Sequence, residues 1–519
     1  NVFAVENEVA ETIATALQVK LLPQESARFA QVATGDPQAY DLFLKGNYYA
    51  NRAFAHGDTK TPQATVSRAA ALYREAVARD PRFALAWARL SLLESRAWWY
   101  GADTADARIG EAERTAKKAL ALDPDLPQTH MAMGFAAYYG HQDYPAALAQ
   151  FEQAARGLPN DADVMAAIAS IHRRQGGWEL ALAEFQQAAT LDPRNPRRYY
   201  ETGVTLTELR RYAEADRQFN QALMIEPRDY MVRAYRIRLA FLSGETARAR
   251  RELAAIPPDA DPRGSFAALR FEFAWLARKP DDAIAALASA PAWVSSAFAE
   301  YEVPTNLLRA RAWSMKGDEA HARRAYEEAR ATLRNALRQQ PDRPVFWGAF
   351  GMTEAGLGDK QAAVGAGGRA VQLVPVSGDA FYGSAHLAVL AAIYAQTAAA
   401  GPAVQLLGKL LAMPSGGTIS VPLLRLDPIW DPIRKSPAFQ SLLKIYQHKE
   451  GTAATTTSRR QRQDIRSEFT RHSRRYGRAA CSDYEANLLM VAARSRSTAA
   501  RTAQLATWSF TKPAACMVA

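Results

Sequence analysis

The sequence is organised around alanine-rich amphipathic segments that end at a proline. Small and aromatic residues recur at fixed offsets before that proline, namely Ala147, Phe151 and Ala154 before Pro159, Ala181, Phe185 and Ala188 before Pro193, and Ala215, Phe219 and Ala222 before Pro227. The i, i+4, i+7 spacing places each trio on one face of a helix. From Pro124 onward the prolines are separated by 35, 34 and 34 residues. The pattern therefore predicts one helix hairpin per 34 residues.

Each period also contains another helix, which comes first in the pair and is predicted by its own recurring large and small residues. These are Trp87 and Leu90, then Tyr199, Gly203 and Leu206, and later Trp347, Phe350 and Gly351. Glycines at positions 176, 244, 317 and 358 fall where a helix must end and the chain must reverse. A single hairpin cannot cover its own apolar face, so neighbouring hairpins must stack. We expect about eight to ten of these pairs and no single central core.

These residues and this period resemble the tetratricopeptide repeat family over roughly residues 40–413. The resemblance implies an all-α fold, a right-handed superhelical solenoid of antiparallel helix pairs. It also implies a protein that works by binding another protein. The match is weakest between Ala254 and Glu300, where several prolines interrupt the helices.

Segments at both ends resemble parts of bacterial TolB-like/TPR signalling and transcriptional regulators. Residues 1–23 look like the closing helix of a truncated TolB-like domain, and the segment AYDLFLKGNYY at 39–49 resembles the stretch that follows it. The segment LRLDPIWDPIR at 424–434 resembles the terminal cap of those proteins. In that group the repeats accompany a DNA-binding, nucleotide cyclase or Ser/Thr kinase domain, none of which this sequence contains.

The predicted organisation follows from these patterns. We expect a TolB-like helix at 1–23, well-formed repeats at 39–253, degenerate repeats at 254–303, further repeats at 304–413, a C-terminal cap at 414–449 and a basic, disordered tail at 450–519.

Charge is concentrated in the predicted tail. Of the net charge of +11, most lies in residues 451–519, which hold twelve Arg or Lys against four acids. Nucleic-acid binding through this tail is one alternative function, and a solvated extension or a shifted reading frame is the blander interpretation. No apolar run is long enough for a transmembrane helix, so we expect a soluble region, cytoplasmic in preference to the periplasmic part of a membrane-anchored regulator.

The sequence offers no constellation that would support catalysis. Its eight histidines show no metal-binding helical spacing, and both cysteines, Cys481 and Cys516, lie in the tail. The glycine-dense stretches at 356–360 and 365–368 follow no strand and do not spell a phosphate loop. We expect no enzyme activity, no cofactor and no metal.

In a solenoid of this type the first helices line the concave surface. Residues there that packing does not require are Arg89, Arg96, Tyr138, Tyr139, Arg173, Arg174, Arg197, Tyr200, Tyr235 and Arg238. Arginine takes a carboxylate with two parallel hydrogen bonds and tyrosine adds contact area, so these residues predict a basic, aromatic groove for an acidic peptide or protein. Solvation of an arginine-rich surface is the alternative interpretation.

The function predicted from the sequence is a protein–protein interaction scaffold, or the sensory TPR region, of a bacterial signal-transduction or transcriptional regulator. The first alternative is the regulatory half of an adenylate or guanylate cyclase or a Ser/Thr kinase whose catalytic domain lies outside this chain. Self-association through either end of the solenoid is also open.

Overall fold

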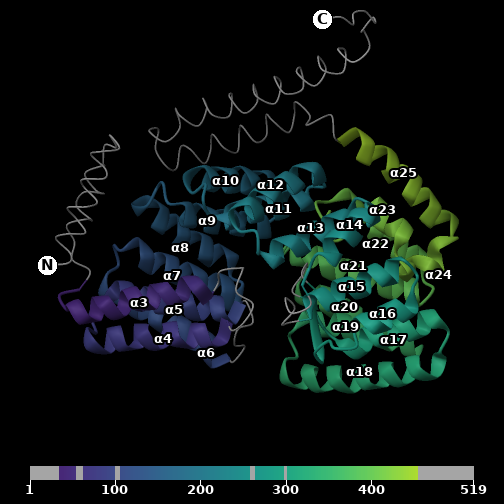
Figure 1. Ribbon diagram of the computed structural model, residues 1–519, viewed down its shortest axis with the longest axis horizontal. Coiled ribbons are helices and arrows are strands. Elements are labelled where there is room, and N and C mark those ends of the chain that lie inside the picture. Colours follow the sequence, from purple (N-terminus) through teal and green to yellow (C-terminus); the bar gives the residue numbers. More distant parts are fainter. Residues whose placement is uncertain (1–33, 54–61, 100–105, 258–263, 297–300, 454–519) are drawn as a thin grey trace, which may run out of the picture. The chain divides into compact units, whose positions relative to one another are not determined.

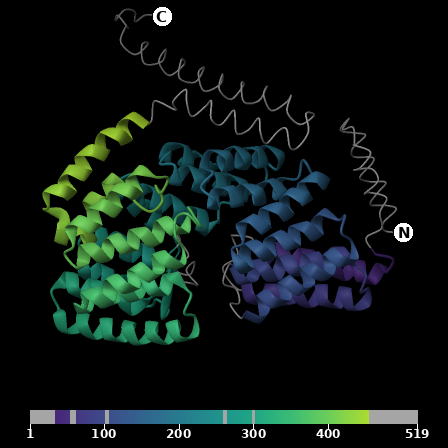
Figure 2. The ribbon, with the colours of Figure 1, turned by 180° about the vertical axis from the view of Figure 1, so that it is seen from behind.

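The computed structural model describes residues 34–53, 62–99, 106–257, 264–296 and 301–453 (Figure 1). Within these ranges the chain forms ten antiparallel helix pairs, each packed on the next (Figures 1 and 2). This confirms the predicted all-α solenoid. The closing helix predicted at 1–23 lies outside the described residues, as does the tail from residue 454 onward.

The first helices of the pairs are α3 (Pro37–Ala53), α5 (Ala84–Trp99), α7 (Pro127–Phe135), α9 (Ala162–Arg174), α11 (Pro196–Glu208), α13 (Tyr230–Leu242), α15 (Ser265–Leu276), α17 (Thr305–Lys316), α19 (Pro344–Leu357) and α21 (Tyr382–Gln396). The second helices are α4 (Pro62–Arg79), α6 (Asp106–Leu122), α8 (Tyr144–Gly157), α10 (Trp178–Leu191), α12 (Tyr212–Ile225), α14 (Thr246–Ala254), α16 (Pro280–Ala286), α18 (Glu319–Gln339), α20 (Lys360–Leu373) and α22 (Ala400–Ala412). After them come α23 (Val421–Leu426), the 3-10 helix η3 (Pro428–Trp430), α24 (Asp431–Arg434) and α25 (Pro437–Ala453).

The proline that ends each period also anchors the next first helix. The side chain six residues after the proline donates a hydrogen bond to the proline carbonyl: Trp87 Nε1 to Pro81 O at 3.1 Å, Tyr199 OH to Pro193 O at 3.1 Å and Trp347 Nε1 to Pro341 O at 2.7 Å. The helix that follows is capped where an Asp or Asn precedes it. For α9, Asp161 accepts from the backbone N–H groups of residues 163 and 164 at 2.8 and 3.0 Å.

The trios found in the sequence form the packing layer between helices. All nine of those alanines and phenylalanines are fully buried, with 0% exposure. The aromatic rings press against glycines of the preceding helix, so that a Cβ added at Gly134 would lie 2.3 Å from the ring of Phe151 and one at Gly203 would lie 2.5 Å from that of Phe219. Glycine at these positions lets the two helices of a pair approach closely.

We expect Gly203→Ala to destabilise the fold by about 1–3 kcal/mol, because the new methyl group must displace the buried ring of Phe219. The matched change Gly365→Ala, in α20, places its methyl group in open space and should instead stabilise the helix by about 0.5–1 kcal/mol. Chemical denaturation followed by circular dichroism measures both changes. Equal effects of the two substitutions would contradict this packing.

The stretch expected to hold degenerate repeats is built differently from its neighbours. It contains one short pair, α15 and α16, followed by an antiparallel hairpin of β1 (Trp293–Ser296) and β2 (Tyr301–Pro304). The second helix begins at Pro280, a position where proline is tolerated, and ends at Ala286, before Pro291. Val294 of β1 is buried against α15, so the hairpin closes a gap that a longer second helix would fill.

Candidate functional site

All ten residues predicted to line the groove lie on first helices or on the π-helical turn η1 (Ala136–His141) that extends α7. The structure divides them into two groups. Arg89, Arg96, Tyr139 and Arg197 line an open groove, whereas most of the others are held in contacts within the chain.

The open groove is formed by five consecutive first helices, from α3 to α11. Arg89 is exposed, and Arg96 and Arg197 are half-buried. The apolar side chains of Leu92 and Phe135 also line the groove. Other lining residues, which the sequence analysis did not single out, are Asn51, Ala88, Gln128, Met131, Leu158, Asp161, Asp163, Val164, Ala166, Ala167, Ser170, Phe185, Arg198 and Glu201. The groove therefore combines an apolar floor with arginines and hydrogen-bonding groups.

Acidic side chains offset part of the positive charge of this groove. Arg198 is buried and pairs with Asp163, and Arg197 lies 3.6 Å from Glu201. The guanidinium of Arg198 holds the pKa of the Asp163 carboxyl group below its usual value. Arg89 makes no hydrogen bond or ion pair with the described residues, so it is the arginine best placed to meet a ligand's charge.

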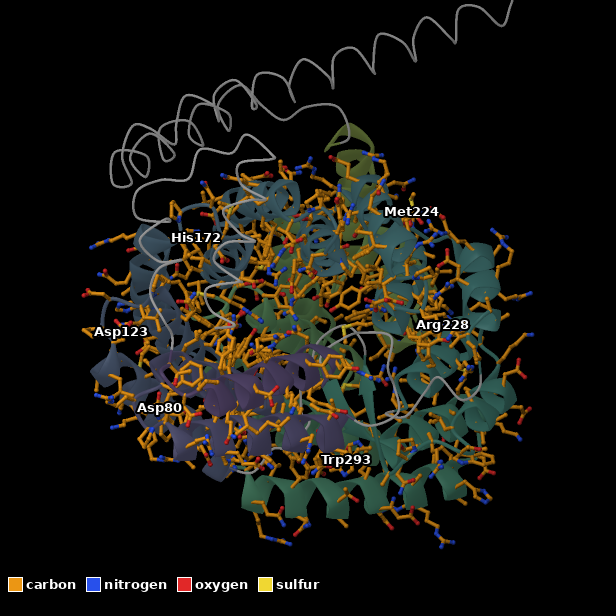
Figure 3. All side chains as sticks on the ribbon, turned by 60° about the vertical axis from the view of Figure 1, so that its left-hand side comes forward. Asp80, Asp123, His172, Met224, Arg228 and Trp293 are labelled. Carbon is orange, nitrogen blue, oxygen red and sulfur yellow. The ribbon has the colours of Figure 1, made fainter. Side chains whose placement is uncertain are left out.

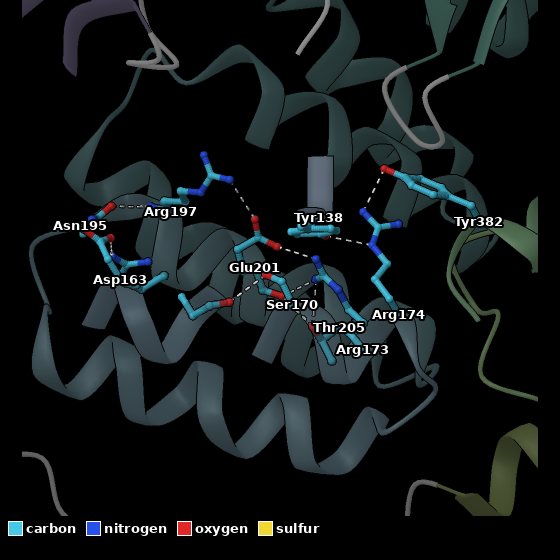
Figure 4. Close-up of polar contacts among 12 residues, drawn as sticks. Tyr138, Asp163, Ser170, Arg173, Arg174, Asn195, Arg197, Glu201, Thr205 and Tyr382 are labelled. Atoms are coloured by element: carbon cyan, nitrogen blue, oxygen red, sulfur yellow. Dashed lines mark hydrogen bonds and ion pairs between the residues drawn. The ribbon is translucent and has the colours of Figure 1, made fainter. Parts of the chain in front are cut away.

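Arg173 is not available in the groove, because its side chain is only 5% exposed. It donates to Glu201 at 2.8 Å and to the hydroxyl of Thr205 at 3.2 Å (Figure 4). Burial acts to raise the pKa of Glu201, yet the charges of Arg173 and Arg197 hold it below the usual range. Arg173 thus ties α9 to α11.

Arg174 occupies a cage of aromatic rings. Its guanidinium lies 3.9 Å from the ring centroid of Tyr382 and 5.5 Å from that of Trp99, and it donates to the hydroxyls of Tyr138 and Tyr382 at 3.0 Å each (Figure 4). The carboxylate of Asp379 forms an ion pair with Arg174, with Oδ2 lying 3.5 Å from Nη1 of the arginine. The same carboxylate accepts a hydrogen bond from the hydroxyl of Tyr144 at 2.5 Å. The predicted groove residue Arg174 therefore binds a distant part of this same chain, Asp379 in the loop between α20 and α21 and Tyr382 at the start of α21. Tyr138 accepts a hydrogen bond from Arg174.

The remaining predicted residues, Tyr200, Tyr235 and Arg238, lie on α11 and α13. Tyr200 and Tyr235 pack edge to face, with ring centroids 5.1 Å apart, and burial raises the pKa of Tyr235 to about 12. Arg238 pairs with Glu272 of α15 and donates to the carbonyl of Thr418 at 3.4 Å. This end of the concave surface is thus also occupied by the chain itself.

Comparison with known proteins bears directly on the repeated pairs. The family described as tetratricopeptide repeat matches residues 133–196, which cover η1 and α8 to α10. The matched segment is similar to a tetratricopeptide repeat. No curated protein matches the chain.

Several solved TPR structures are similar to this chain. A thermophilic TPR protein from Thermus thermophilus is 18% identical, with 39% of this chain and 97% of that chain covered and a TM-score of 0.32. A tetratricopeptide repeat protein from Parabacteroides merdae is 14% identical, covering 49% and 91% with a TM-score of 0.35. Human IFIT1, in a dimer with m7Gppp-AAAA, is 13% identical, covering 72% and 77% with a TM-score of 0.41.

The described residues were compared with the requirements of two other features, a metal site and a membrane-spanning helix. No cluster of three or more His, Cys, Asp or Glu residues there could hold a metal ion. None of the helices in those same ranges has the length and apolar character needed to cross a membrane.

Proposed function

We propose that this chain is a protein-interaction scaffold that binds an extended acidic segment of a partner in the open groove formed by α3 to α11. The observation that carries this proposal is the position of Arg89, exposed and without a hydrogen bond or ion pair to the described residues, in a groove that five first helices line and whose apolar residues include Leu92 and Phe135. Arg96 lies seven residues later on the same helix face. An acidic side chain would meet the arginines while a neighbouring apolar side chain packs near Leu92 and Phe135.

The mixed charge of the groove supports a particular kind of ligand. Asp163 and Glu201 already occupy Arg198 and Arg197, so a uniformly acidic segment would meet repulsion at the α9 and α11 end. A segment with carboxylates near Arg89 and Arg96, followed by apolar or polar residues, avoids the repulsion from Glu201 and meets only that from Asp163, which also interacts with the charges of these two arginines. We propose that the partner's segment has its acidic residues at one end and apolar or polar residues after them.

We also propose that the scaffold serves a bacterial signal-transduction or transcriptional regulator. The support is the resemblance of residues 39–49 and 424–434 to those regulators. Sequencing the genomic region upstream of the coding segment tests it, because a DNA-binding, cyclase or kinase domain in the same reading frame would be expected.

The groove is tested with a defined library of nine-residue peptides, in which acidic residues are placed at either end of an apolar core. We expect Arg89→Glu together with Arg96→Glu to weaken the best peptide at least about tenfold in fluorescence anisotropy, because two attractive charges become repulsive. The matched control is Arg228→Glu, an exposed arginine outside the groove, labelled in Figure 3.

Affinity for the peptide should also fall as salt concentration rises, since the arginines are close to solvent. Circular dichroism confirms that each variant remains helical. If no acidic peptide binds better than its basic counterpart, or if the groove variant binds as tightly as the Arg228 control, the groove is not the binding site.

A further inference from the structure

The outer face of the first helix pair, α3 and α4, carries exposed apolar side chains. Leu44 and Tyr48 of α3 are 41% and 56% exposed. Together with Leu72 of α4 they line a hollow that Lys45 and Arg68 also line. This face therefore offers apolar contact area beside positive charge, a combination typical of a surface that another element covers.

The equivalent face of the next first helix is buried. Gly46 of α3 and Ser91 of α5 hold the same place, because each lies against the second helix of its own pair. Two residues after them come Tyr48 and Leu93. Leu93 is only 2% exposed, because it packs into a cluster with side chains of α3 and α4. The face around Tyr48 is thus the one that a preceding helix covers elsewhere in the solenoid.

The path of the chain brings its own N-terminal segment to this face. From α5 onward each first helix packs on the second helix before it, and α3 has no such predecessor among the described residues. Asp36 pairs with Arg79 at 2.7 Å and Thr34 donates to Asp80, so the chain enters α3 beside the end of α4. Residues 23–33 can span about 35–40 Å when extended, whereas Tyr48 lies about 16 Å along α3 from its start.

The pattern of residues 1–22 fits the hollow. The sequence predicts an amphipathic helix whose apolar residues are Phe3, Val9, Ile13, Leu17 and Leu21. The segment carries three acids, Glu6, Glu8 and Glu11, against one lysine, Lys20. Its net negative charge complements the basic residues of the hollow. Lys45 also pairs with Asp41, but both side chains are 59% exposed, so this pair competes only weakly.

A second copy of the chain fits this face less well. A symmetric dimer would use the same surface on both copies. Two hollows that each contain Lys45 and Arg68 would then be enclosed in one interface, and their like charges would repel.

We propose that residues 1–22 bind the outer face of α3 and α4 within the same chain, with their apolar side chains against Leu44, Tyr48 and Leu72. The segment then takes the place of a second helix before α3 and covers the end of the solenoid. This contact does not depend on the acidic peptide proposed for the groove.

Photo-crosslinking of the full chain tests the proposal. The photoreactive residue benzoylphenylalanine replaces Tyr48 in one sample and Leu44 in another, and mass spectrometry identifies the linked peptides. An equal mixture of unlabelled and ¹⁵N-labelled chains separates links within one copy from links between copies. We expect links from both positions to residues 1–22 of the same copy. A probe at Met224, which is 75% exposed on α12, should give no such link.

A matched pair of variants tests the apolar contact. Ile13→Asp with Leu17→Asp should lower the yield from the probe at position 48 at least about fivefold, because a carboxylate buried against apolar groups is costly. Thr15→Asp, on the opposite side of the predicted helix, should leave the yield unchanged. The proposal is overturned if the probes link to another copy or to no part of residues 1–22. It also fails if the Met224 probe links as well as they do, or if the double variant links as well as Thr15→Asp.

Discussion

Phe219→Ala is expected to lower the free energy of unfolding by about 3–5 kcal/mol. Phe219 is fully buried in α12 and its ring packs under Gly203 of α11, so alanine leaves a cavity between two repeats that cannot collapse without moving whole helices. Urea denaturation followed by circular dichroism measures the loss. Because each repeat is stabilised by its neighbours, the helix pairs on either side of α11 and α12 should also unfold at a lower urea concentration.

The matched control lies on the same helix. Met224, labelled in Figure 3, is 75% exposed, so Met224→Ala should change the stability by less than about 0.5 kcal/mol. A comparable loss in both variants would contradict the packing of α12 against α11.

Arg174→Met is expected to cost about 3–5 kcal/mol, because it leaves the carboxylate of Asp379 buried without its cation. The methionine keeps most of the volume within the aromatic cage, so the loss reports the charge and its hydrogen bonds to Tyr138 and Tyr382. Thermal and urea denaturation both measure it.

The control for this change is Arg89→Met, which removes an exposed arginine without partners in the described ranges and should be neutral within about 0.5 kcal/mol. Adding Asp379→Asn to Arg174→Met should recover part of the lost stability, because the unpaired charge is then removed. If Arg174→Met proves neutral, Arg174 does not hold the α20–α21 loop, and its assignment as a structural residue fails.

The fold could be predicted from the sequence because its determinants are local and periodic. The trio around Phe185 fixes the second helix, and the position six residues after each proline fixes the start of the first. The sequence analysis found Trp87, Tyr199 and Trp347 at those positions without identifying their hydrogen bonds to proline carbonyls. That bond spans six residues and recurs with the period, so its signal was present in the sequence.

The groove could be predicted only in part. The helical register placed both Arg89 and Arg174 on the concave side. It contains no information on which distant part of the chain packs against each of them. Asp379 and Tyr382, which enclose Arg174, come from about 200 residues further along the chain and share no periodic signal with it. The same holds for Gly416, whose backbone N–H donates to the carbonyl of Glu208 at 2.9 Å, because the sequence does not distinguish it from other turn glycines.

The arginines predicted to line the concave surface fall into two kinds. Arg89 lies in the open groove, whereas Arg173 and Arg174 are held in buried ion pairs within the chain. A variant that reverses the charges of Arg173 and Arg174 would place carboxylates inside buried ion pairs and would unfold the central repeats. Loss of binding in such a variant would carry no information on the groove. Arg89 can be changed without this penalty, since it is exposed.

The most direct test is carbene footprinting of the full chain with and without the best acidic peptide. The account predicts that the peptide reduces labelling in α5 around Arg89 and Arg96 and in α7 around Phe135, and leaves labelling of α9 at 173–174 and of the loop at 379–382 unchanged. Reduced labelling confined to residues 173–174 and 379–382, or to helices outside α3 to α11, would show that the partner binds elsewhere.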